Sequence, residues 1–268
     1  MDELTAEARQ GLRAAHGDRL DAWCCSVPGL VNDLLGEWSL RPTGEVFSGF
    51  GGIAVGVESH DGRRAVLKLT VPYGNAALEI ALLTTWGGRG SVLTRQLAVP
   101  TPAEVAADDR VLRIDREWSG FVAELEQALC HPHRHLSDRA LATAIATCRE
   151  LGPDQPDTVL HGDLHGRNVM ASDREPWLVI DPLGLVGEAG LECLTSLRDR
   201  ADQLRASDAP ARGLDRQIQA FGEAAETDHS RVRAWVQARS ALSVARGIRD
   251  DHGLHLWLAE TLLRPAVY

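Results

Sequence analysis

Apolar residues near the N-terminus recur at helical spacing. Residues 3–23 predict an amphipathic helix, because leucine and alanine side chains return every three or four positions. Pro28-Gly29 predicts a break, since proline interrupts a helix interior and glycine favours turns. A second helix is then expected to begin at Leu30 and to run to about Trp38.

Beyond that helix the pattern changes to that of strands. Residues 44–57 predict two strand-type runs joined by a Gly-rich turn, Asp61-Gly62 predicts a hairpin, and residues 65–69 predict the next strand. Residues 75–83 return to helical spacing, and residues 111–116 predict one further strand.

The second half of the chain is mostly helical in pattern. Two short apolar runs of strand type, Val159-Leu160 and Trp177–Ile180, interrupt it and bracket a polar loop. This distribution predicts an α+β fold, with an antiparallel sheet and helices first and mainly helices afterwards. The predicted helices are 119–130, 137–151, 212–225, 229–249 and 254–263.

The polar loop holds Asp163 and Asn168, and Asp181 follows the second apolar run. Kinase-type phosphoryl transfer needs such a set, because one carboxylate accepts the proton of the acceptor hydroxyl while an Asn and a second Asp hold Mg²⁺. Two other interpretations are open. His161, Asp163 and His165 alternate as metal ligands on one face of a strand would, and a lone Asp on a loop is often a turn former. The order Asp, Asn, Asp beside two apolar runs favours the kinase interpretation.

The Gly-rich turn and the strand after it predict a phosphate-binding element. Gly49, Gly51 and Gly52 would let backbone N–H groups approach triphosphate oxygens closely. Lys68 lies within an apolar strand, where an ammonium group is costly to bury without an anionic partner. Phosphate oxygens and the carboxylate of Glu79, on the next predicted helix, would supply that partner; alternatively, Glu79 is a solvated position.

The segments HGDLHGRN and VIDP resemble the catalytic loop and the metal-binding segment of aminoglycoside phosphotransferases. EPWLVIDPLGLVGEAGLE is more similar to the branch that contains streptomycin 6-phosphotransferases and hydroxyurea phosphotransferases. The resemblance implies a two-lobed protein-kinase-like fold, ATP and Mg²⁺ as cosubstrates, and a small hydroxylated acceptor. By position, Asp163 matches the catalytic base, and Asn168 and Asp181 match the metal ligands.

The same resemblance implies how the chain is divided. Residues 1–116 would form the N-terminal lobe and residues 117–268 the C-terminal lobe, with a hinge near residues 112–118. ATP would bind between the lobes, with its phosphates under residues 49–52 and beside Lys68.

Acidic residues after Asp181 are candidates for binding the acceptor. Glu188 and Glu192 follow it closely, and Asp250 and Asp251 end a predicted helix, where the helix dipole prefers cations. Carboxylates could bind guanidinium or amine groups there, or could be solvated. The region before the catalytic loop is shorter than in the resembled family, so the identity of the acceptor stays open.

Composition narrows the class of partner. The chain has 268 residues, of which 44% are hydrophobic and 25% charged, and a formal net charge of −10. That charge disfavours nucleic acid and anionic membranes, which bind clustered Lys and Arg, and is compatible with a cationic small molecule. The sequence lacks an apolar run of about 20 residues and the features of a signal peptide. The five Cys lack metal-ligand spacing, so we expect reduced thiols in a cytoplasmic protein.

We therefore expect an ATP-dependent phosphotransferase that moves the γ-phosphate of ATP to a hydroxyl of streptomycin or a related aminoglycoside, and so inactivates an antibiotic. One alternative is a kinase for another small metabolite or a hydroxyurea-like compound. Another is a nucleotide-binding pseudokinase or regulatory module. The sequence is compatible with a monomer or a homodimer.

Overall fold

The computed structural model describes residues 10, 12, 17–49, 51–72, 76–93, 111–131, 135–248 and 253–266. Contacts divide the chain into two compact units, residues 1–76 and residues 77–268, which are described in turn. The division into lobes after residue 116 stays a prediction.

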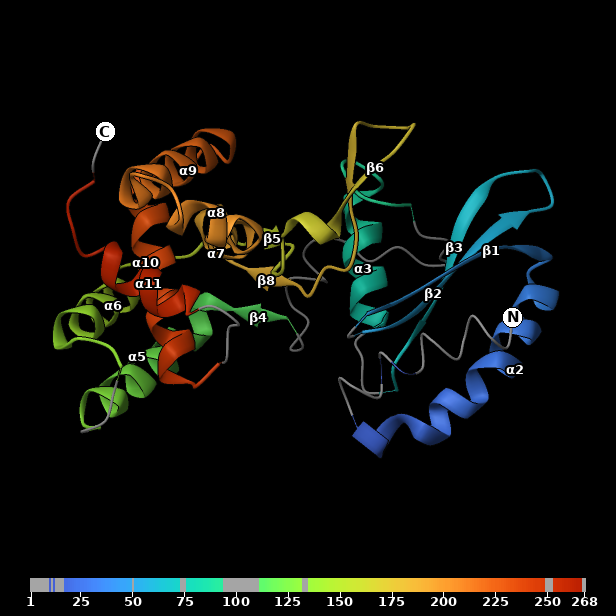
Figure 1. Cartoon of the computed structure of the whole chain (residues 1–268), viewed down its shortest axis with the longest axis horizontal. Helices are drawn as coiled ribbons and strands as arrows, with labels where there is room; N and C mark the ends of the chain where they lie inside the picture. Colours follow the sequence, from blue (N-terminus) through green and yellow to red (C-terminus); the bar gives the residue numbers. More distant parts are fainter. Residues whose placement is uncertain are drawn as a thin grey trace. The chain divides into compact units, whose positions relative to one another are not determined.

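The first unit is a three-stranded antiparallel sheet with a helix packed on one face (Figure 1). The sheet has the order β1-β2-β3, and alternate side chains of β2 and β3 join buried side chains of α2 in a single core. A 3-10 turn precedes α2. The elements are η1 (Gly17–Leu20), α2 (Asp21–Glu37), β1 (Leu40–Gly49), β2 (Gly52–Ser59) and β3 (Arg64–Thr70).

The break predicted at Pro28-Gly29 is wrong, because α2 continues through both residues. The buried residues of α2 keep helical spacing on both sides of Pro28; they are Cys24, Val27, Val31 and Leu35. An interior proline costs a helix about 3 kcal/mol, and burial of these side chains against the sheet offsets that cost. Most of the N-terminal part of predicted helix 3–23 lies outside the described residues.

The Gly-rich turn joins β1 to β2 as a tight hairpin. Gly49 pairs with Gly52, and the backbone N–H of Val71 donates to the carbonyl of Gly51 over 3.0 Å. A Cβ at Gly52 would lie 2.1 Å from the carbonyl oxygen of Leu69, so only glycine fits at that position. The turn is therefore held against the end of β3.

The described residues of the second unit form a helix at its start, three short strand pairs and a group of helices. Strand β8 pairs with β4 on one side and with β5 on the other, while β6 and β7 form a separate hairpin. The strands are β4 (Leu112–Arg113), β5 (Val159–Leu160), β6 (Val169–Ala171), β7 (Trp177–Val179) and β8 (Leu185–Val186). The α-helices in the described part of this unit are α3 (Ala76–Trp86), α5 (Ile114–Leu129), α6 (Asp138–Leu151), α7 (Cys193–Leu197), α8 (Ala201–Arg205), α9 (Pro210–Ala224), α10 (His229–Ala245) and α11 (Leu254–Thr261).

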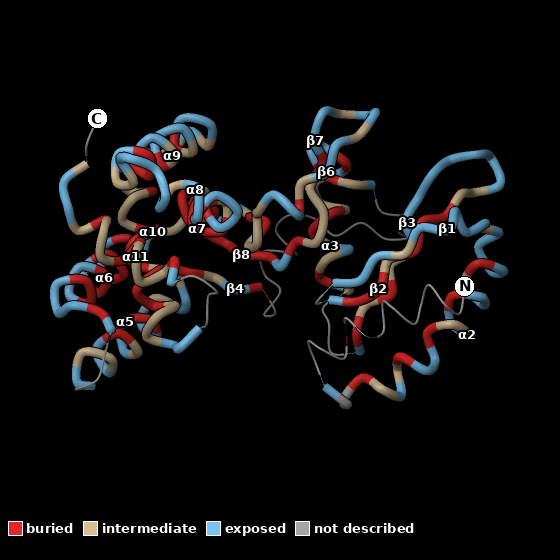
Figure 2. Tube along the Cα trace, viewed as in Figure 1, coloured by how far each residue is buried: buried red, intermediate tan, exposed pale blue. Residues whose placement is uncertain are grey.

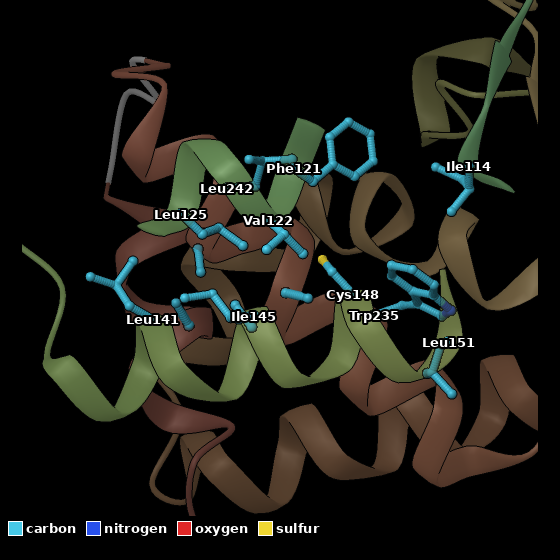
Figure 3. Close-up of a cluster of buried hydrophobic side chains, with 14 of the residues drawn as sticks. Ile114, Phe121, Val122, Leu125, Leu141, Ile145, Cys148, Leu151, Trp235 and Leu242 are labelled. Carbon is cyan, nitrogen blue, oxygen red and sulfur yellow. The ribbon is translucent and has the colours of Figure 1, made fainter. Parts of the chain in front are cut away.

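Helix α10 packs against several other helices of this unit, and many of its residues are buried (Figure 2). Side chains of α5, α6 and α10 interdigitate in the largest core, where Trp235 is almost fully buried (Figure 3). No helix among the described residues has the length and apolar character needed to cross a bilayer. The predicted α+β class is confirmed by this combination of an antiparallel sheet and many helices.

The strand predicted over residues 111–116 is largely wrong, because only Leu112 and Arg113 pair with a neighbour and α5 begins at Ile114. Ile114 starts the buried stripe of α5 and is almost fully buried. Asp115 favours a helix start because its carboxylate complements the positive end of the helix dipole. Hydrogen bonds from the Arg113 guanidinium also hold the pKa of Asp115 below its usual value.

Candidate active site

The catalytic loop predicted from the sequence runs from β5 to β6. Leu160 of β5 is buried beside β8, and the backbone N–H groups of Leu183 and Gly184 both donate to the carbonyl of His161 over 2.9 Å. The loop ends in a 3-10 turn, η2 (Gly166–Asn168), directly before β6. Its two ends are therefore fixed by strands, which gives Asp163 a defined backbone position.

The buried side chain of His161 holds the loop in place. It is buried and its ring is stacked on Trp86, with 6.2 Å between the ring centroids. Nδ1 accepts from the backbone N–H of Asp163 over 3.2 Å, so Nε2 carries the proton and donates to the carbonyl of Ile180 over 2.8 Å. Both ring nitrogens are thus used by backbone groups rather than by a metal.

The carboxylate of Asp163 is flanked by two nitrogen groups. Nε2 of His165 lies 3.4 Å from Oδ2, and Nη1 of Arg198 lies 3.4 Å from Oδ1. Nδ1 of His165 accepts from the backbone N–H of Arg167 over 3.2 Å, which directs Nε2–H toward the carboxylate. The Asp163 side chain is 25% exposed and so stays accessible.

The β6–β7 hairpin brings Asn168 and Asp181 to the same end. The backbone N–H of Ile180 donates to the carbonyl of Asn168 over 3.0 Å, and Asp181 is the next residue. Nδ2 of Asn168 donates to the carbonyl of Asp163 over 3.0 Å, so its Oδ1 is the atom left to face a cation. Asp181 has a φ of 58°, which is uncommon for a residue other than glycine.

This donor set fits Mg²⁺. Mg²⁺ prefers oxygen ligands and is usually held by one or two carboxylates together with substrate phosphates and water. The Oδ1 of Asn168 and the carboxylate of Asp181 are oxygen donors of that kind. Among the described residues, which leave out 94–110, 132–134 and 249–252 besides shorter stretches, no three His, Cys, Asp or Glu side chains are grouped as metal ligands.

Two acidic side chains fasten the loop from the segment that follows β8. Glu192, at the end of η3 (Ala189–Glu192), accepts from the backbone N–H of Gly162 over 2.6 Å. Asp199, in η4 (Arg198–Arg200), accepts from the backbone N–H of Gly166 over 2.5 Å. The second carboxylate oxygen of Glu192 is buried, and the described residues offer it no hydrogen-bond partner.

Arg239 of α10 is a charged residue that the sequence analysis did not select. Burial lowers the pKa of its guanidinium, and the negative charges of Glu192 and Asp163 oppose that shift. The guanidinium also donates to the carbonyl of Leu191. The half-buried Arg239 of α10 thus balances the negative charge of Glu192 and Asp163, and the exposed Arg198 lies beside Asp163 as well. Both lie far from the loop in sequence, so only tertiary packing shows them.

The predicted acceptor residues have different surroundings. Glu188 is buried, and its two carboxylate oxygens accept from Nε of Arg231, over 2.7 Å, and from Nε1 of Trp235. Glu192 is buried, and its carboxylate accepts the hydrogen bond from the backbone N–H of Gly162. Asp250 and Asp251 lie outside the described residues.

The predicted phosphate-binding residues lie in both units. Gly49, Gly51 and Gly52 form the β1–β2 turn, and half-buried Lys68 pairs in register with Ala54 in the first unit. Glu79 lies in the first turn of α3 in the second unit. The pairing of Lys68 with Glu79 stays a prediction.

Comparison with known proteins assigns the chain to a family. Residues 119–251 match the family model described as aminoglycoside/hydroxyurea antibiotic resistance kinase. The chain is 31% identical to streptomycin 6-kinase of Streptomyces glaucescens over 88% of both chains, and 31% identical to streptomycin 6-kinase of Streptomyces griseus over 93% of both. It is 29% identical to hydroxyurea phosphotransferase of Kitasatospora aureofaciens over 80% of this chain and 71% of that one.

A solved structure is also similar. The macrolide 2'-phosphotransferase of Brachybacterium faecium, as the apoenzyme, is 15% identical, with a TM-score of 0.48, over 89% of this chain and 99% of that chain.

Proposed function

The chain belongs to the aminoglycoside/hydroxyurea antibiotic resistance kinases, and from that membership we propose that it phosphorylates streptomycin or a related aminoglycoside with ATP and Mg²⁺. It is a phosphotransferase with an alcohol group as acceptor. The two streptomycin 6-kinases that match most of the chain support streptomycin as the acceptor. All three relatives are named for phosphate transfer, which argues against a binding module without catalysis.

One observation carries the proposal: side-chain-to-backbone hydrogen bonds of the loop hold Asp163 and Asn168 together, and a backbone hydrogen bond from Ile180 to Asn168 brings the neighbouring Asp181 to the same end. In the proposed reaction, the Asp163 carboxylate orients the acceptor hydroxyl and accepts its proton. The hydroxyl oxygen forms a bond to the γ-phosphorus, the bond from that phosphorus to the bridging oxygen breaks, and ADP leaves with the electron pair. Phosphoryl transfer depends mainly on positioning and charge stabilisation, which suits a rigid loop.

We propose that Asn168 and Asp181 hold Mg²⁺, which would neutralise the phosphate charge. Gly49, Gly51 and Gly52 are the proposed backbone contacts to the triphosphate, with Lys68 beside them. Acceptor contacts by Glu188 would have to compete with its bonds to α10.

A hydroxyurea-like acceptor is the second candidate. The 29% identity to hydroxyurea phosphotransferase, over most of both chains, favours it over an unrelated metabolite. The two candidates differ in charge and size, so a panel of acceptors distinguishes them.

The decisive experiment compares the wild-type protein with Asp163→Asn and Asp173→Asn. Asp173 is an exposed carboxylate of the β6–β7 turn and is a matched control for loss of one negative charge. Each protein is incubated with ATP, Mg²⁺ and streptomycin, a second aminoglycoside or hydroxyurea, and products are identified by mass spectrometry. We expect phosphostreptomycin from wild type and Asp173→Asn, at a rate about 10²–10⁴-fold above that of Asp163→Asn.

Two other outcomes would change the proposed acceptor or the proposed catalytic base. A product from hydroxyurea alone would replace streptomycin by the second candidate. Equal rates for wild type and Asp163→Asn would contradict the role of Asp163 as the base.

A further inference from the structure

Arg198 contacts the proposed catalytic base directly. Its Nη1 lies 3.4 Å from Oδ1 of Asp163, while His165 approaches the other carboxylate oxygen. The Arg198 side chain is 49% exposed, so one side of its guanidinium faces the carboxylate and part of it remains accessible. A guanidinium has five N–H donors in a planar fork, and contact through Nη1 leaves other donors for a second anionic group.

The backbone that carries Arg198 is attached to the catalytic loop. The next residue, Asp199, accepts from the backbone N–H of Gly166 over 2.5 Å. A Cβ at Gly166 would lie 2.7 Å from Oδ2 of Asp199, so a side chain at position 166 would displace the Asp199 carboxylate from this contact. Before Arg198, Leu197 and most of α7 are buried. The position of Arg198 beside Asp163 is thus set by packing on one side and by a loop contact on the other.

The reaction creates a need for a cation at this place. A base carboxylate and a phosphoryl group that both carry negative charge repel each other when the acceptor hydroxyl is brought between them. The hydroxyl must lie about 3 Å from the base and about 3–3.5 Å from the phosphorus. A guanidinium in contact with the base carboxylate is therefore within one side-chain length of the phosphoryl oxygens.

We propose that Arg198 is a further catalytic residue, which binds the transferring phosphoryl group while it remains beside Asp163. Its stabilising effect is needed in the transition state, because the negative charge is then spread over the equatorial oxygens of the transferring phosphoryl group. The proton of the acceptor hydroxyl still passes to Asp163, and ADP leaves with the electron pair. The inference rests on the proposed transfer from ATP, but not on the identity of the acceptor.

A competing role is that of a barrier. In that case Arg198 would block Asp163 until a cationic acceptor displaces its guanidinium. Removing Arg198 would then lower the KM for the acceptor and leave kcat unchanged or raised, which is the opposite of the outcome that the proposal requires.

The test uses Arg198→Gln, Arg198→Lys and the control Arg200→Gln. Arg200 lies in the same 3-10 segment, is exposed, and is removed from Arg198 by two positions. We expect Arg198→Gln to lower kcat about 10²–10³-fold, as loss of one preorganised charge-stabilising group does, with little change in the KM for ATP. Arg198→Lys should recover part of the rate, and Arg200→Gln should match wild type.

A binding measurement separates this proposal from the proposed acceptor. Aluminium fluoride with ADP and Mg²⁺ imitates the transferring phosphoryl group and needs no acceptor. Aluminium fluoride should tighten ADP binding to wild type and Arg200→Gln, but not to Arg198→Gln. If no acceptor in the panel is phosphorylated, the proposed acceptor fails while this measurement still tests Arg198. Equal tightening in wild type and Arg198→Gln, no tightening in either, or an unchanged kcat would overturn the proposal.

Discussion

His161 serves three neighbours with one ring, and this makes it a sensitive position at the scale of a single residue. His161→Phe keeps an aromatic ring for Trp86 but removes the bonds to Asp163 N–H and Ile180 carbonyl. A buried polar group without a partner costs about 1–3 kcal/mol, so the free energy of unfolding should fall by at least that amount. Loss of the bond to Asp163 should also lower kcat. Urea unfolding and steady-state kinetics measure the two effects.

The matched control is His60→Phe. His60 lies in an exposed turn of the first unit, so its replacement should change the free energy of unfolding by less than about 0.5 kcal/mol. An unfolding midpoint for His161→Phe equal to that of wild type would show that the two bonds do not brace the loop.

Residue types and spacing predict much of the local arrangement of the candidate site. His161, Asp163 and Asn168 are close in sequence, so a loop between two strands brings them together, and the structure places all three on that loop. Arg198 and Arg239 could not be predicted in the same way. Their distance from the loop depends on how η4 and α10 pack, and nothing in the sequence around them distinguishes them from the other arginines of the chain.

At the scale of an element, two glycines of the β1–β2 hairpin have different roles: Gly52 is needed for the packing of the turn, and Gly51 is proposed to contact phosphate. Gly52→Ala would place a Cβ 2.1 Å from the carbonyl oxygen of Leu69, and alanine is strained at a φ of 154°. Overpacking of this kind costs about 1–3 kcal/mol, so the free energy of unfolding should fall by that amount. Gly51→Ala meets nothing within 4 Å and should leave it unchanged.

The variants Gly51→Ala and Gly52→Ala also test the proposed contact between the turn and the triphosphate of ATP. Because Gly51→Ala keeps the fold, an increase in its KM for ATP would report loss of a close approach between the turn and the triphosphate. Thermal unfolding and the KM for ATP are measured for both variants. Equal stability of the two variants would contradict the steric argument, and an unchanged KM in Gly51→Ala would remove Gly51 from the proposed contacts.

Elements predicted from hydrophobic spacing agree with the structure where that spacing is the only strong signal. The predictions are wrong where a local signal, such as a proline, competes with burial in the folded chain. Helices α6, α9, α10 and α11 begin within two residues of their predicted starts. Pro28 suggested a break, but burial of the helix face on both sides outweighed the local signal. Residues 111–116 have apolar alternation suited to a strand, yet Ile114 and the acidic first turn begin α5. In both places burial against other parts of the fold determined the structure, and a short stretch of sequence does not show which residues will be buried.

At the scale of the whole molecule, the net charge of −10 gives a test of the acceptor class. An acidic protein attracts a cationic acceptor at long range, and salt screens that attraction, with a Debye length of about 30 Å at 0.01 M and about 8 Å at 0.15 M ionic strength. With ATP and Mg²⁺ saturating, kcat/KM for streptomycin should fall several-fold across this range, while that for uncharged hydroxyurea should change little. Parallel salt dependence for both acceptors would show that the field of the chain does not select for cations, and would assign specificity to contacts at the site alone.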